Sequence, residues 1–312
     1  MIPKFCRIFC LVFLIGDFHS SLSHFDNNRP KLLNSNINNG SIATLDDARH
    51  QASIRLVNKD VTFGEGHICS GSLISSRVVL TAGRCLFNSD TKTTRHPAEL
   101  IVVLGSINRY QRTADTVISR ITHIRYPSTF DMETMSDDIG LLFLSHEVPE
   151  NHSTIRPIEL NRKNIDINMM RGRVTGWELS KNGDLSQQLL VSNASIVNQT
   201  SCVTKVEGPH IRNGMICAKY NRIEGNLCQS DVGAPLVNAG KQIGLASWTA
   251  DSCSTQSDHQ LASYTDVAHH TKWIRTEMSD GNNTDSSVWG ALGFLALSWF
   301  AFKDKQKLSF RF

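Results

Sequence analysis

Residues 69–85 read CSGSLISSRVVLTAGRC, in which short runs of apolar and β-branched residues stand between small polar ones. Runs of this kind recur between turn signals along the chain, at 77–80 (RVVL), 100–104 (LIVVL), 139–144 (IGLLFL), 173–175 (RVT) and 243–248 (IGLASW). Many short strands separated by Gly, Asn and Asp are typical of an all-β sandwich or barrel. Near the end, Asp266 precedes a stretch in which apolar residues share one face of a helix, namely Val267, Trp273, Ile274 and Met278. These patterns predict a β domain closed by a C-terminal helix.

The N-terminus has the pattern of a secretory signal. Lys4 and Arg7 precede an apolar run at 8–16, and small residues at 20–23 suit cleavage before His24. We therefore predict a signal peptide at 1–23 and a short polar leader at 24–36. A short membrane anchor is the alternative, but no stop-transfer pattern follows.

The C-terminus carries a second apolar run. A polar linker at 279–287 leads to 288–302 (VWGALGFLALSWFAF), and a basic tail follows at 303–312. As a helix the run would span about 22 Å, which is less than the ~30 Å hydrocarbon core. A membrane anchor, a lipid-anchor signal and an amphipathic docking tail are the alternatives.

The cysteines and the glycosylation sequons predict that the chain lies outside the cell. Of the 8 cysteines, Cys6 and Cys10 leave with the signal, and the remaining even number predicts disulfides in an oxidising compartment. Clustering favours Cys69–Cys85, Cys202–Cys217 and Cys228–Cys253 among the ~15 connectivities that six cysteines allow. Glycosylation sequons begin at Asn39, Asn151, Asn193, Asn198 and Asn282.

The net charge of +3 and the lack of a basic patch predict no nucleic-acid partner, and we find no pattern for a metal or cofactor.

Three blocks together resemble the chymotrypsin/trypsin family of serine proteases. They are 69–85, which matches the block of the catalytic histidine, 137–142 (DDIGLL), which matches that of the aspartate, and 228–237 (CQSDVGAPLV), which matches that of the nucleophile. The resemblance covers 37–278. It implies two antiparallel six-stranded-type β-barrels with an active-site-like cleft between them, and it supports the three disulfide pairs above.

Only one residue of the catalytic triad survives at the matching positions. The base position is Arg84, whose guanidinium stays protonated and has no acceptor lone pair. The nucleophile position is Val232, which has no side-chain heteroatom. Asp138 remains. Ser230 lies nearby but would have no neutral base, so a displaced nucleophile is not expected.

The resemblance also locates weakened supporting positions. Ser230 stands where the family has a glycine that donates its N–H to the oxyanion hole, and Val232 is the other oxyanion position. The specificity-pocket positions are Asn226, Thr249 and Ala262, and the neutral Asn226 should weaken recognition of Arg or Lys. The activation-type positions are Asn36, Ile37 and Asp231, and Asn36 is not a trypsin-like cleavage site.

Asp138 should need a partner if it is buried in an inactive site. We expect an Arg84–Asp138 ion pair, because a guanidinium suits two-point contact with a carboxylate. The alternative is that Asp138 persists by capping backbone N–H groups.

The resemblance and the substitutions together predict a secreted, catalytically inactive homologue. It would bind extracellular proteins such as proteases, substrates or inhibitors as a regulator, cofactor or decoy. The alternatives are a serine endopeptidase with residual activity and a membrane-attached recognition protein.

Overall fold

The computed structural model describes residues 41–162, 170–177, 186–199, 211–221, 231–249 and 259–280. Several predicted features lie outside these residues: the signal peptide, the leader, the hydrophobic run at 288–302, and the positions Asn36, Ile37, Cys202, Asn226, Cys228, Ser230 and Cys253. Within the described residues, no helix is long and apolar enough to cross a membrane.

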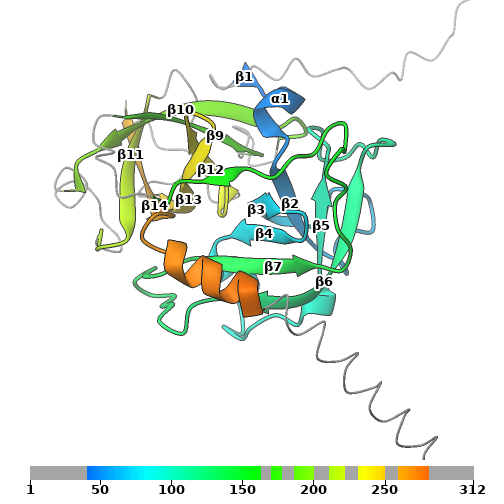
Figure 1. Cartoon of the computed structure of the whole chain (residues 1–312), viewed down its shortest axis with the longest axis horizontal. Helices are drawn as coiled ribbons and strands as arrows, with labels where there is room; N and C mark the ends of the chain where they lie inside the picture. The colour runs from blue at the N-terminus through cyan, green and yellow to red at the C-terminus, as the bar shows by residue number, and fades with distance from the viewer. Residues whose placement is uncertain are drawn as a thin grey trace, which may run out of the picture. The chain divides into compact units, whose positions relative to one another are not determined.

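The first half of the chain forms a closed antiparallel barrel with the strand order β2-β3-β4-β7-β6-β5 (Figure 1). Its strands are β2 (Gln51–Leu56), β3 (His67–Ser75), β4 (Val78–Thr81), β5 (Leu100–Leu104), β6 (Val117–Arg125) and β7 (Gly140–Leu144). The predicted strands at 77–80, 100–104 and 139–144 are β4, β5 and β7. β4 and β7 are buried along their whole length, which explains why they read as apolar runs and not as an alternating pattern. β2 is equally buried although it alternates polar and apolar residues.

The second half closes in the same way. Its strands are β9 (Arg171–Gly176), β10 (Leu190–Val197), β11 (Met215–Asn221), β12 (Pro235–Asn238), β13 (Lys241–Thr249) and β14 (His259–Asp266). They run in the order β10-β11-β14-β13-β12-β9, and pairing of β9 with β10 closes the ring. β1 (Ser41–Ile42) extends β10, and β8 (Glu159–Leu160) pairs in parallel with β13. The fold is therefore the predicted pair of six-stranded antiparallel barrels.

Short helices stand at the ends of strands. They are α1 (Leu45–Ala48) and the 3₁₀ turns η1 (Gly83–Leu86) and η2 (Pro97–Glu99). Residues 271–280 form the predicted C-terminal helix. Its Ile274 is buried, and Trp273 and Met278 pack with it against the core of the first barrel. The helix therefore packs against the first barrel, although it follows the second barrel in the sequence.

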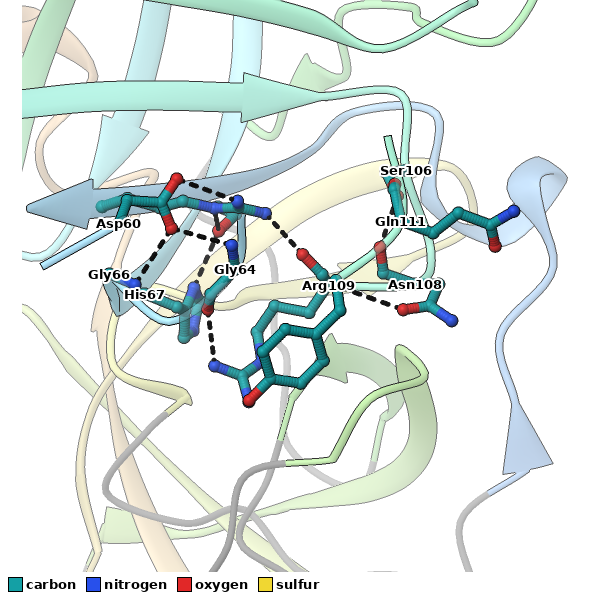
Figure 2. A network of polar contacts seen from close by, with 11 residues as sticks. Asp60, Gly64, Gly66, His67, Ser106, Asn108, Arg109 and Gln111 are labelled. Carbon is teal, nitrogen blue, oxygen red and sulfur yellow. Dashed lines mark hydrogen bonds and ion pairs between the residues drawn. The ribbon is translucent and has the colours of Figure 1, made fainter. Parts of the chain in front are cut away.

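A buried polar network fixes the loop between β2 and β3, as Figure 2 shows. Asp60 accepts the backbone N–H groups of Gly64 and Gly66 through one oxygen, at 2.8 and 3.0 Å. Its other oxygen lies 3.3 Å from Nη1 of Arg55 on β2. Arg55 also donates to the Arg109 carbonyl at 3.0 Å, and Arg109 donates to the Gly64 carbonyl at 2.8 Å. The network joins this loop to the segment after β5 through groups that water does not reach.

His50, just before β2, should make the fold sensitive to acid. Burial lowers its pKa from 6.5 to about 4, and its Nε2 has no hydrogen-bond partner among the described residues. Between these pH values the unfolded chain binds a proton that the native state excludes. The contribution of the neutral His50 to the free energy of unfolding is therefore fully present above pH 6.5. It should fall by up to ~3 kcal/mol as the pH drops toward 4.

Urea unfolding at intervals between pH 4 and 7 measures this slope. A His50→Gln variant should show a flatter profile than the wild type, because glutamine does not titrate. Parallel profiles for the two proteins would contradict the assignment.

Candidate functional site

Arg84 and Asp138 lie at the ends of two paired strands. Arg84 is in η1, directly after β4, and Asp138 is two residues before β7. Thr81 of β4 pairs with Gly140 of β7. The segment after β4, which carries Arg84, and the segment before β7, which carries Asp138, therefore lie at the same edge of the first barrel. The sequence blocks that carry the base and acid positions meet because their strands are neighbours.

Asp138 is fully buried and holds contacts from both barrels. Its Oδ1 accepts the backbone N–H of Arg84 at 2.8 Å. Its Oδ2 accepts the hydroxyl of Ser247, on β13, at 2.6 Å. The hydroxyl of Thr265, on β14, donates to the Asp138 carbonyl at 2.8 Å. The carboxylate is thus fixed in place by groups other than a catalytic base.

The predicted Arg84–Asp138 ion pair is present, with Nε of Arg84 at 3.3 Å from Oδ2. The two-point hydrogen bond that motivated this prediction is absent, because neither Nε nor Nη2 of Arg84 has a hydrogen-bond partner in the described part of the chain. Ser247 and the backbone N–H of Arg84 donate to the two oxygens of Asp138 instead. The alternative role, backbone capping, is therefore present alongside the ion pair. Burial lowers the pKa of the Arg84 guanidinium, and the charge of Asp138 opposes this.

Val232 reaches the site from the second half of the chain, just before β12. Its carbonyl accepts the backbone N–H of Ser70, on β3, at 2.8 Å, which joins the two barrels. Gly233 follows with φ of +86°, and a Cβ there would collide with the carbonyl of Ser70. Asp231, the predicted acceptor of a new N-terminus, is buried against Gly176.

A cavity of about 440 Å³ is lined by both Arg84 and Val232, the predicted base and nucleophile positions. Its apolar lining includes Ile68, Phe87, Val232 and Trp248, and its basic lining is Lys59, Arg84 and Arg95. No carboxylate is among the described residues that line it. Nη2 of Arg84 is buried and has no hydrogen-bond partner in the described part of the chain. The side chain of Arg84 is 23% exposed, so the described lining presents positive charge to an anion and carries no carboxylate or histidine to accept a proton.

Of the other predicted positions, those of the specificity pocket, the oxyanion hole and the disulfides, the structure describes only some. Ala262 is buried on β14, where it pairs with Thr249 of β13 and Ala218 of β11. Asn226 and Ser230 lie outside the described residues, so the predicted floor and oxyanion positions stay predictions. The Cys69–Cys85 disulfide is confirmed. Cys217 is disulfide-bonded, and its predicted partner Cys202 lies outside the described residues.

One cluster of potential ligands was not predicted. Asp137, His269 and His270 each place one ligand atom within 4.8 Å of the others. Burial raises the pKa of the Asp137 carboxyl, but hydrogen bonds from Thr129 and His270 outweigh it and hold the pKa below its usual value. The adjacent histidines before the C-terminal helix were the available sequence signal. Their partner lies about 130 residues earlier, so no local spacing connects them.

Comparison with known proteins gives a consistent result. The family model for trypsin matches residues 37–274. Trypsin alpha of Drosophila melanogaster is 30% identical over 212 residues, covering 67% of this chain and 77% of that protein. Serine protease SP24D of Anopheles gambiae is 27% identical over 251 residues, covering 80% of this chain and 84% of that protein. The region matched by the family model contains both barrels and every residue of the cavity described above.

Proposed function

The chain belongs to the trypsin family of serine proteases, and from this premise we propose that it is a secreted pseudoprotease, which binds extracellular proteins without cleaving them. The observation that carries the proposal is the pair Arg84 and Val232, which line one cavity at the base and nucleophile positions. Acyl transfer needs a nucleophile and a base with a free lone pair. A guanidinium and an isopropyl group supply neither.

The cavity supports binding as the retained role. Asp138 is held by Ser247 and by the backbone of Arg84, which supports a site that keeps its shape without the catalytic groups. Its aromatic and apolar lining suits side chains of a partner protein. The partly exposed guanidinium of Arg84 and the nearby Lys59 and Arg95 would lower the free energy of a bound carboxylate, because charge-assisted hydrogen bonds are the stronger kind. We therefore expect the partner to insert an acidic side chain or a C-terminal carboxylate.

Location outside the cell rests on the sequence. The N-terminal signal pattern and the disulfides suit an oxidising compartment. Asn151, Asn193 and Asn198, three of the predicted glycosylation sites, are exposed. The role would be that of a regulator, cofactor or decoy in extracellular proteolysis.

One peptide library, read for both cleavage and binding, tests the proposal. The disulfide-bonded protein is used before and after an engineered cut at Ile37, with trypsin as the positive control. We expect no cleavage and no covalent labelling by a fluorophosphonate in either state. Acidic peptides should bind, and an Arg84→Gln variant should bind them about tenfold more weakly, as expected for loss of a charged hydrogen bond.

Two outcomes would contradict the proposal. Labelling that maps to a serine near Val232 would make the protein an endopeptidase with a displaced nucleophile. If the wild type binds acidic and neutral peptides equally well, and the Arg84→Gln variant binds both as the wild type does, the cavity is not the recognition site.

A further inference from the structure

The cluster of Asp137, His269 and His270 lies at the start of the C-terminal helix, one residue from Asp138. His270 is buried, Asp137 is partly buried and His269 is exposed. We propose that these three residues bind a divalent transition-metal ion, with Zn²⁺ as the ion that their chemistry fits best. Two imidazoles and one carboxylate are a common zinc ligand set, and a solvent molecule completes the usual four.

The hydrogen bonds of His270 fix which of its ring nitrogens faces Asp137. Its Nδ1 lies 2.8 Å from the carbonyl oxygen of Asp266, which can only accept, so Nδ1 carries the hydrogen. Its Nε2 lies 2.8 Å from Oδ1 of Asp137, and an ionised carboxylate also only accepts. Nε2 of His270 and Oδ1 of Asp137 therefore face each other as two potential ligand atoms for one ion.

The surrounding contacts orient the ligands as outer-shell contacts do in known metal sites. The Asp266 carbonyl fixes the His270 ring so that Nε2 faces the site. The hydroxyl of Thr129 donates to the other oxygen of Asp137 at 2.6 Å, which leaves Oδ1 directed at His270. Such contacts on ligating histidines and carboxylates hold the ligands in position for the ion.

His269 provides the route for an ion from solvent. It is exposed, and its ring packs against Gly214, where a Cβ would come within 2.9 Å of a ring carbon. Its ring centroid is 5.0 Å from that of His270. Lys272 and Arg275 line the same surface hollow as His269 and disfavour a cation there, which argues for moderate affinity.

Binding requires a small opening of the site. Zinc bonds of about 2.0 Å at a tetrahedral angle separate a nitrogen and an oxygen ligand by about 3.3 Å. The Nε2–Oδ1 distance of 2.8 Å must therefore widen by about half an ångström. Without an ion, the two groups close on each other as an ordinary ion pair.

Zinc titration of the untagged, disulfide-bonded full chain against a chromophoric chelator tests the proposal. We expect one zinc per chain. The exposed His269→Ala and the buried His270→Ala should each lower the affinity by at least a hundredfold, roughly the upper end of outer-shell effects. Thr129→Val should lower it by about tenfold, because it removes only an outer-shell contact. His146→Ala, which removes an exposed histidine from another loop, is the matched control and should change nothing.

X-ray absorption of the zinc-loaded protein gives an independent readout, with imidazole nitrogens and a carboxylate oxygen expected around the metal. His269→Ala keeps the test valid if His270→Ala fails to fold. No zinc binding by the wild type, or zinc binding that His269→Ala and Asp137→Asn leave unchanged, would overturn the proposal. In either case the Asp137–His270 contact would be an ion pair that only anchors the helix. Neither result depends on whether the protein cleaves or binds peptides.

Discussion

Replacing Arg84 by histidine and Val232 by serine together should make the protein react with a fluorophosphonate about 10³-fold faster than either single variant. The two residues act as one unit, because a serine without a base and a base without a nucleophile are equally inert. Single restorations should therefore behave like the wild type. The gain in the double variant should be far larger than the sum of the two single effects.

The retained surroundings of Asp138 are the physical basis for this expectation. Its Oδ1 accepts the backbone N–H of residue 84, which fixes where a histidine at that position would begin. Oδ2 is held by Ser247 and lies 3.3 Å from Nε of Arg84, so an imidazole N–H could take the place of the guanidinium. A complete triad is worth on the order of 10⁶ in rate. Loss of an oxyanion donor, as Ser230 predicts, would remove about 10²–10³ of it.

Asp138→Asn in the double variant is the matched control. It should return the labelling rate to that of the single variants, a loss of about 10³, because asparagine favours the wrong tautomer of the histidine. Labelling is measured after an engineered cut at Ile37, and the modified residue is located by mass spectrometry. A correctly folded double variant that stays unreactive would show that the site lost more than these two groups.

The sequence predicted those parts of the molecule that have a local signature. β4, β5 and β7 are short apolar runs bounded by turn residues, and a strand buried on both faces leaves that pattern wherever it lies. The Cys69–Cys85 disulfide is confirmed, and it bounds the stretch that contains β4 and most of β3. The helix at 271–280 was visible because Ile274 and its neighbours share a face.

Features that depend on distant partners could not be predicted in the same way. The Arg84–Asp138 ion pair was expected because the family resemblance placed both residues at one site, but the hydrogen bond that Asp138 accepts from Ser247, 109 residues away, was not. The Asp137–His270 contact joins residues 133 apart. Asp60 and Arg55 are close in sequence, yet nothing in that segment indicated that both would be buried. Charged side chains are usually exposed, and only the tertiary fold covers this pair.

Asp60→Ala should lower the free energy of unfolding by about 3–5 kcal/mol, because it leaves a buried charge without its partner. The side chains of Arg55 and Asp60 are only 1% and 6% exposed. Burial lowers the pKa of Arg55, and the nearby Asp60 carboxylate opposes that effect. The backbone N–H groups of Gly64 and Gly66 would also lose their acceptor.

The variant Arg55→Met identifies the cause of this loss. If the unpaired guanidinium is responsible, the double variant Asp60→Ala/Arg55→Met should be more stable than Asp60→Ala alone, since an apolar side chain has no charge to desolvate. If the loop N–H groups are responsible, adding Arg55→Met should give no recovery, whereas Asp60→Asn, which keeps an acceptor oxygen, should cost less than Asp60→Ala. Urea unfolding with the disulfides intact measures the free energy of unfolding of the wild type and of each of these variants. Asp90→Ala, at an exposed loop position, is the control. A loss below about 1 kcal/mol for Asp60→Ala would contradict the burial of this pair, because that is the range of exposed ion pairs.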